Sequence, residues 1–322
     1  MSAICLGQKV RCAPRLSSLC KMLVARFPCL RTALVHRRQP AAMMEGSGMM
    51  KYTLMRYVRL SFCILMLASG QCQPLEQRTD PAWHILGVWR QPQGLPQNSV
   101  LAIVQTSDGY IWAGTRGGLA RFDGMHFTTF DTSQKGQLKE NEIWALVEGN
   151  DSSLWVGTYG GGLTRLKDGK FTTYTTENGL VDNFVTSLSK DNTGAIWIGT
   201  NNGLSRFQDG RITNYTTKDG LADNYVWALY CDRDDNVWIG TNNGRLSRFH
   251  DGRFYSRAVE GLKPYTPIRS LYRDRDQVLW AGTGDGLFAL KDGAAIRYTT
   301  KDGLFSNMVF RLYQDPGGTL WI

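Results

Sequence analysis

The clearest pattern in this chain is an alternation between short apolar segments and turns rich in Asp, Asn and Gly. Residues 179–219 contain four such segments, each with the composition of a short strand. The segments are residues 185–188, 195–200, 204–207 and 212–216. Asp209-Gly210 separates the last two, and this dipeptide favours a tight β-hairpin. The pattern therefore predicts four short antiparallel strands joined by tight turns.

The four-strand pattern recurs with a period near 42 residues. A tryptophan opens the motif Trp-(Ile/Val/Ala)-Gly-Thr in each repeat. These tryptophans are Trp112, Trp155, Trp197, Trp238, Trp280 and Trp321, at intervals of 43, 42, 41, 42 and 41 residues. A four-stranded unit with this period is typical of β-propeller blades. We therefore expect an all-β fold, a propeller over residues 71–322 with five complete blades and a truncated sixth. The repeats lie near residues 94–136, 137–178, 179–219, 220–260, 261–302 and 303–322.

The strands themselves have a regular chemistry. The first strand of each repeat is of the type Val-x-small-Leu, and alternation places x and Leu on one face. Trp144 and Trp227 occupy position x, and we expect them to pack between blades, with stacking on a ligand as the alternative. The repeated Trp is expected in the core. The Gly two residues after it is expected to let another segment of backbone approach closely.

The segment before the first repeat indicates how the propeller closes. Trp89 stands five residues before a Gly-Leu pair, as Tyr174 does at the start of the third repeat. Residues 83–90 are therefore expected to form the outermost strand of the last blade, which removes open strand edges. The chain stops inside the second strand of the sixth repeat, and we interpret it as a truncated product or a partial sequence.

The N-terminal part differs in composition from the repeats. Residues 1–59 hold eleven Lys or Arg and one Glu, so the remaining 263 residues carry −1 of the net charge of +9. The repeats therefore lack the basic excess that nucleic-acid binding requires. In residues 49–70, three basic residues precede an apolar run and a small-residue cleavage site, which is typical of a secretory signal peptide. Residues 1–48 are expected to be a non-native or disordered extension.

Residues 179–207 and 220–249 resemble the two-component regulator propeller repeat, NG-L-x-x-N-x-V-x-x-L-x-x-D-x-x-G-x-L-W-I-G-T-x-x-G-L-x-R-F. The resemblance covers residues 94–322 and departs at an insertion near Gly244 and at Ala289, where other repeats have Arg. It implies the extracytoplasmic sensor half of a histidine kinase, hybrid regulator or diguanylate cyclase at the periplasmic face of the bacterial inner membrane. It also implies a seven-bladed parent that forms a homodimer, with an anchor and a signalling domain downstream in cis.

The sequence contains no recognisable catalytic motif. Nucleophile-elbow, P-loop, dinucleotide and zinc-protease patterns are absent, so we expect no cofactor and no activity in this chain. Turn carboxylates recur and could bind Ca²⁺, but each repeat supplies too few oxygens for such a site. These carboxylates belong to Asp191, Asp232, Asp274 and Asp315. The alternatives to a sensor are a secreted scaffold for protein partners and, less favoured, a propeller hydrolase or lyase.

A ligand site is expected where the loops that lead into the first strands converge. Repeated residues build the blades, whereas residues that vary at equivalent positions are free to specify a partner. Phe184, Tyr225 and Tyr265 are aromatic and could lie against the apolar face of a sugar ring, and Glu142 and Asn183 could bind its hydroxyls. The expected ligand is a small molecule or an oligosaccharide. The alternative is that these aromatic residues pack against neighbouring loops or a downstream domain.

Overall fold

The structure is a computed structural model of the chain and describes residues 9–10, 88–134, 136–315 and 317–322. The chain divides into two compact units, one of Met1–Cys12 with Trp89–Ile322 and one of Ala13–Val88. The expected signal peptide over residues 49–70 lies outside the described residues. So do nearly all of residues 1–48 and most of the expected closing segment, residues 83–90.

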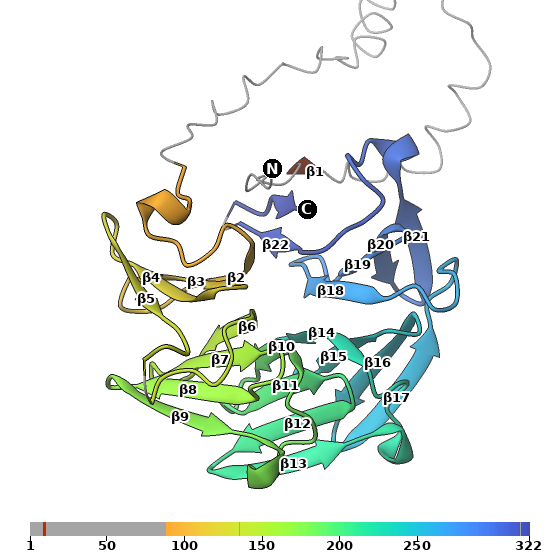
Figure 1. The fold of residues 1–322 in the computed structure, drawn as a ribbon. Helices are drawn as coiled ribbons and strands as arrows, with labels where there is room; N and C mark the ends of the chain where they lie inside the picture. Colours follow the sequence, from red (N-terminus) through yellow and green to blue (C-terminus); the bar gives the residue numbers. More distant parts are fainter. Residues whose placement is uncertain (1–8, 11–87, 135, 316) are drawn as a thin grey trace, which may run out of the picture. The chain divides into compact units, whose positions relative to one another are not determined.

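The first unit is built from four-stranded antiparallel sheets, each made of four consecutive strands (Figure 1). Blade 1 holds β2 (Val100–Gln105), β3 (Ile111–Thr115), β4 (Gly118–Phe122) and β5 (Phe127–Phe130). Blade 2 holds β6 (Ile143–Glu148), β7 (Leu154–Thr158), β8 (Leu163–Lys167) and β9 (Lys170–Tyr174). Blade 3 holds β10 (Val185–Lys190), β11 (Ile196–Thr200), β12 (Gly203–Gln208) and β13 (Arg211–Tyr215).

The same order continues in the second half of the unit. Blade 4 holds β14 (Val226–Cys231), β15 (Val237–Thr241), β16 (Arg245–His250) and β17 (Arg253–Ala258). Blade 5 holds β18 (Ile268–Arg273), β19 (Leu279–Thr283), β20 (Gly286–Lys291) and β21 (Ala294–Tyr298). The sixth repeat contributes β22 (Tyr313–Gln314) and β23 (Leu320–Trp321), and β23 also pairs with β1 (Lys9–Val10). Five complete sheets and a partial sixth confirm the predicted all-β propeller of four-stranded blades.

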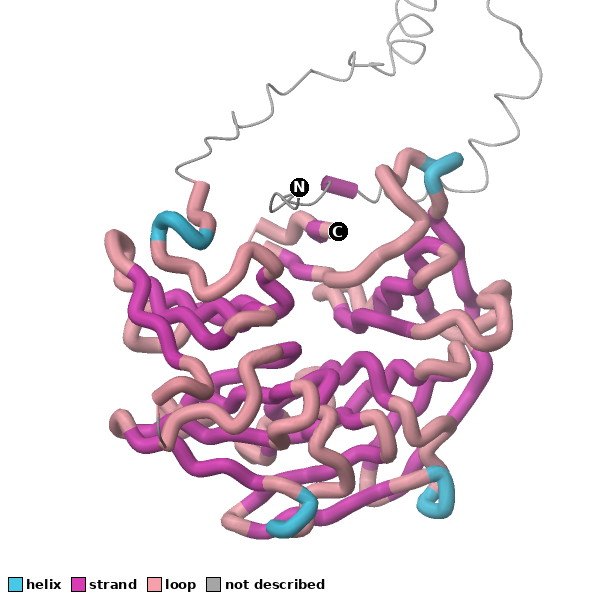
Figure 2. The backbone as a smooth tube through the Cα atoms, viewed as in Figure 1, coloured by secondary structure: helices cyan, strands magenta, loops and turns pink. Residues whose placement is uncertain are grey.

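Among the described residues, helix is confined to single 3₁₀ turns before blade 1 and in connections between repeats, which Figure 2 shows in cyan among magenta strands. These turns are η1 (Gln91–Gln93), η2 (Thr176–Asn178), η3 (Thr217–Asp219) and η4 (Thr300–Asp302). Each ends at a Gly in the left-handed region, with φ between 96° and 105°. The repeated Asn of the next loop accepts a hydrogen bond from the first residue of the turn, as Asn183 does from the Thr176 N–H at 2.9 Å.

The first strand of every complete blade contains a β-bulge at its second residue. In blade 3, Val185 pairs with Thr200 and Ser187 pairs with Gly199, so that Thr186 is the extra residue. A bulge interrupts the alternation of faces and redirects the extra side chain. The second residue of each first strand therefore does not share a face with the Leu that follows, contrary to the simple alternation expected from the sequence.

The Gly of each Trp-x-Gly-Thr motif lies against the first strand of the following blade. A Cβ built on Gly157 would lie 2.5 Å from Val185 Cγ1, and one on Gly240 would lie 2.6 Å from Ile268 Cγ2. The corresponding pairs in the other blades are Gly114 with Ile143, Gly199 with Val226 and Gly282 with Val309. The sequence predicted a close approach of backbone, and backbone is among the nearest atoms at Gly114, Gly240 and Gly282, whereas at Gly157 and Gly199 the nearest atoms are side-chain atoms. The repeated glycine is therefore the contact point between consecutive blades.

Replacing Gly240 by Ala is expected to lower the free energy of unfolding by about 1–3 kcal/mol, because the new methyl group overpacks the contact between blades 4 and 5. Its Cβ would also lie 2.8 Å from the Ile268 carbonyl oxygen, which cannot move without shifting β18. Gly284→Ala is the matched control, since its Cβ would meet only Thr266 Cγ2 at 3.7 Å. Urea denaturation of both variants measures the difference. Equal effects would contradict the role of Gly240.

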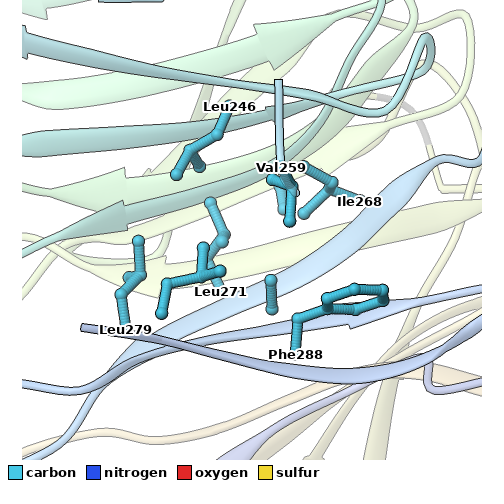
Figure 3. Packing of buried hydrophobic residues seen from close by; sticks show 9 residues of the cluster. Leu246, Val259, Ile268, Leu271, Leu279 and Phe288 are labelled. Carbon is cyan, nitrogen blue, oxygen red and sulfur yellow. The ribbon is translucent and has the colours of Figure 1, made fainter. Parts of the chain in front are cut away.

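The hydrophobic core lies between neighbouring blades. Figure 3 shows one such layer, where Leu246 of blade 4 faces Ile268, Leu271, Leu279 and Phe288 of blade 5. Equivalent clusters join the other consecutive blades. The repeated tryptophans lie in these layers as expected. Trp112, Trp155, Trp197 and Trp280 are buried, and Trp238 is half-buried.

Trp89 packs against blade 1 as the last residue of one blade packs against the next blade. Its ring contacts Phe122 of β4 with centroids 5.2 Å apart. Tyr174, the last residue of the fourth strand of blade 2, contacts Phe207 of blade 3 in the same way at 5.0 Å. The position of Trp89 therefore agrees with its expected equivalence to Tyr174. The described residues 88–90 contain no strand.

Candidate functional site

The bulged positions of the first strands bring unrepeated side chains together. In blades 1 to 5 the bulged residues are Leu101, Trp144, Thr186, Trp227 and Arg269. Phe310 is the equivalent residue of the sixth repeat by sequence, and it lies outside the strands of that repeat. The rings of Trp144 and Trp227 contact one another with centroids 5.7 Å apart, although they belong to blades 2 and 4. The first strands of consecutive blades lie side by side along this inner edge. Contact between non-adjacent blades therefore places both tryptophans where the first strands converge.

This placement corrects the expectation that Trp144 and Trp227 form core between neighbouring blades. Both side chains are only half-buried, and their ring contact spans blade 3. The bulge is the physical reason, because it turns the second residue of the strand away from the face that packs on the next blade. Thr186, at the same position of blade 3, is buried and its hydroxyl is bound to main-chain carbonyls.

Five aromatic side chains from blades 2, 3 and 4 form a continuous group, which we call the axial aromatic cluster. Trp144 stacks on Tyr159 with centroids 5.0 Å apart and an interplanar angle of 17°. Tyr159 contacts Phe184 edge to face at 4.7 Å. Tyr225 stacks on Trp227 at 5.0 Å and 15°. The Trp144–Trp227 contact joins the two halves of the cluster.

Polar groups hold the two tryptophans in place. The Trp144 indole N–H donates to Glu142 Oε1 at 3.1 Å, and the Trp227 indole N–H donates to Asn242 Oδ1 at 2.9 Å. Arg116 Nε of blade 1 lies 3.5 Å from Glu142 Oε1. Each indole N–H thus has an acceptor.

Cationic side chains complete the group on the side of blade 5 and the sixth repeat. The Arg269 guanidinium lies over the Trp227 ring at 5.0 Å from its centroid and over the Phe310 ring at 5.3 Å. Arg311 donates to the carbonyl oxygens of Leu101 at 3.2 Å and Trp144 at 3.4 Å. Burial raises the pKa of Tyr225, with an additional raising effect from Tyr159 and an opposing one from Arg269.

The structure brings together only some of the residues expected from the sequence. Phe184 and Tyr225 belong to the axial aromatic cluster, and Glu142 binds its Trp144 indole. Asn183 binds the N-terminus of η2 through its side-chain oxygen, as the equivalent asparagines do, so its role is structural. Tyr265 is 83% exposed, and among the described residues its ring has no aromatic partner.

The sequence analysis missed three contributors, Tyr159, Arg269 and Phe310. Tyr159 follows the Gly-Thr of its repeat, where the other repeats have Arg, Asn or Gly. Arg269 occupies the variable position of its first strand, and Phe310 occupies the equivalent sequence position of the sixth repeat. Variation at a position that is otherwise regular is the signal that could have identified all three.

The turn carboxylates that were considered as Ca²⁺ ligands accept hydrogen bonds from groups of their own blades. The indole N–H groups of the repeated tryptophans donate to them at 2.7–3.0 Å, as Trp197 does to Asp191. Backbone N–H groups of the same turns donate to them as well. Within the described part of the chain, no three His, Cys, Asp or Glu side chains gather as a metal site would require. In the same part, no helix has the length and apolarity needed to cross a membrane.

Comparison with known proteins agrees with the repeat structure. Five segments match the family model described as two component regulator propeller: residues 94–117, 137–160, 179–202, 220–243 and 262–285. A search of curated protein sequences gives no significant match.

Similar solved structures include extracellular domains from B. thetaiotaomicron. One belongs to BT3049, described as a hybrid two component system, with a TM-score of 0.64 and 23% identity over 73% of this chain and 34% of that chain. Another belongs to BT4673, described as a one component system, with a TM-score of 0.58 and 21% identity over 70% of this chain and 33% of that chain. This chain thus spans about a third of those domains. Virginiamycin B lyase from Staphylococcus aureus has a similar fold, with a TM-score of 0.56 and 16% identity over 69% of this chain and 76% of the lyase.

Proposed function

Because this chain carries five repeats of the two component regulator propeller family, we propose that it is the extracytoplasmic ligand-sensing propeller of a two-component signal transduction protein. The ligand is a small molecule or an oligosaccharide that binds the axial aromatic cluster. The likeness to extracellular domains of two-component systems supports an exported location. A signal peptide over residues 49–70 would direct the chain to the periplasm, where an anchor and a signalling domain in cis would follow. The full-length protein would act as a homodimer.

The observation that carries this proposal is the axial aromatic cluster itself. Its aromatic residues do not follow from the repeat, since equivalent positions hold Leu101, Thr186 and Arg269 in other blades. Blade construction therefore does not require them. Half-buried aromatic rings with hydrogen-bonded polar ends are typical of surfaces that bind a partly apolar ligand such as a sugar ring.

A binding screen of the full chain against oligosaccharides tests the proposal, with tryptophan fluorescence as the readout. Tyr225→Ala and Phe184→Ala are expected to weaken binding of any ligand found by about three- to tenfold, which corresponds to roughly 0.5–1.5 kcal/mol of lost aromatic contact. Tyr255→Ala is the control, because Tyr255 lies exposed on β17 and contacts Arg248 rather than the cluster. Unchanged affinity in both cluster variants, with folding intact, would place the site elsewhere.

A further inference from the structure

Arg269 is a half-buried cation that has no acidic partner among the described residues. No carboxylate oxygen of that part of the chain lies within 4.0 Å of its guanidinium nitrogens, and its Nε is buried without an acceptor. Most buried polar groups in proteins have a hydrogen-bond partner. The Nε atoms of Arg165 and Arg206 are also buried without an acceptor, but both of those guanidinium groups are paired with a carboxylate, whereas that of Arg269 is not.

Three other partly buried arginines of the propeller are paired with carboxylates. Arg165 binds Asp151, Arg273 binds both Asp232 and Asp234, and Arg297 binds Asp285. These pairs lie on the blades, away from the axial aromatic cluster. Among the described residues, Arg121 and Arg248 also have no carboxylate within 4.0 Å and lie over aromatic rings of blades 1 and 4, so Arg269 differs from them by its place beside the axial aromatic cluster.

The residues around Arg269 contact its guanidinium group but do not neutralise its positive charge. The guanidinium lies over the Trp227 and Phe310 rings, and these cation–π contacts supply no acceptor for its N–H groups. The nearby Arg311 adds a second positive charge, and it donates only to main-chain carbonyl oxygens. Three carboxylates of the described residues bind the cluster, and none of them pairs with Arg269. Glu142 binds Arg116 and the Trp144 indole, and Asp182 and Asp223 accept the backbone N–H groups of Phe184 and Tyr225.

We propose that Arg269 binds an oxyanion of the ligand, a carboxylate or a sulfate group, while the rest of the ligand lies on the axial aromatic cluster. This inference rests on the proposed function and names its ligand class as acidic. The planar fork of a guanidinium matches both oxyanions with two parallel hydrogen bonds. Its stacking on Trp227 and Phe310 holds the fork in place before the ligand arrives, which reduces the entropy lost on binding.

The test uses two pairs of probes that differ only in charge, titrated into the full chain with tryptophan fluorescence as the readout. Trigalacturonate and its trimethyl ester report on a carboxylate, and glucose 6-sulfate and glucose report on a sulfate. We expect one acidic probe to bind at least tenfold more tightly than its uncharged partner, with an affinity that falls as salt is added. Arg269→Gln should abolish this preference and Arg269→Lys should keep part of it. Arg253→Gln, at an exposed position of β17, should keep all of it.

The outcomes separate this inference from the proposed function. Equal binding of the acidic and uncharged probes, or a preference that survives in Arg269→Gln, overturns the oxyanion site. If uncharged sugars bind and Tyr225→Ala weakens them, the sensor proposal survives without it. If none of the four probes binds, the oxyanion proposal is overturned, whereas the wider oligosaccharide screen still decides the proposed function. Unchanged melting temperatures of the Arg269 variants show that the losses are losses of binding.

Discussion

Replacing Trp197 by Ala is expected to lower the free energy of unfolding by about 3–5 kcal/mol, the range for truncating a large buried aromatic residue. Only 1% of Trp197 is exposed. Its ring contacts Tyr215 of blade 3 and Phe249 of blade 4, so the cavity would open the layer between these two blades. The substitution also leaves the half-buried Asp191 carboxylate without its indole donor. Urea denaturation followed by circular dichroism measures the loss.

Trp144→Ala is the matched comparison for this prediction. It removes the same side chain from a half-buried position whose contacts are with other residues of the axial aromatic cluster. Because less surface returns to water and no layer between neighbouring blades is opened, we expect it to cost clearly less stability than Trp197→Ala. It should instead weaken ligand binding. Equal destabilisation by the two substitutions would contradict the division between blade core and axial cluster.

The repeated residues of the sequence were sufficient to predict the blades, because they make contacts that recur from blade to blade. Each repeat needs a Gly where the next blade approaches and a Trp whose indole reaches the turn before it. Gly240 beside Ile268 and Trp197 beside Asp191 are instances of these two contacts. Since each contact occurs in several repeats, comparing the repeats within this one sequence is enough to identify the residues that make it.

The candidate site was only partly predictable, because its geometry depends on features that leave no regular trace in the sequence. Simple alternation placed Trp144 and Trp227 between blades, whereas the bulge turns them toward the converging first strands. Asn183 was a candidate because it lies in the right loop, yet its recurrence indicated the structural role that it has. Tyr265 lies in the longer loop between β17 and β18, where its backbone is left-handed with φ of 59° and its side chain is exposed. The correct criterion was variation at an otherwise regular position of the repeat, which Arg269 and Phe310 also satisfy.

Replacing Asp232 by Asn is expected to lower the free energy of unfolding at neutral pH by about 3–5 kcal/mol, because it removes one partner of a buried ion pair. The side chain of Asp232 is 3% exposed, and Arg273 NH1 lies 2.6 Å from its Oδ2. The same oxygen accepts the Trp238 indole N–H at 2.8 Å. Asp232 thus joins blade 4 to β18 of blade 5, and its loss leaves the Arg273 charge without its most buried partner.

The pH dependence of this effect follows from the pKa of Asp232. Burial alone would raise this pKa, but hydrogen bonds from Trp238, Asn236 and Arg273 outweigh burial and lower it below the ordinary value of 3.8. Because the folded pKa is the lower one, the stabilisation is complete above the unfolded pKa and is lost as the pH falls through the folded pKa. The difference in melting temperature between the natural chain and Asp232→Asn should therefore stay constant from neutral pH to about pH 5 and shrink below about pH 4. Asp251→Asn, in an exposed hairpin turn, should show no such difference at any pH. If the difference in melting temperature stays the same in acid, the packing of the Asp232 side chain, and not its ionised carboxylate, accounts for the stabilisation.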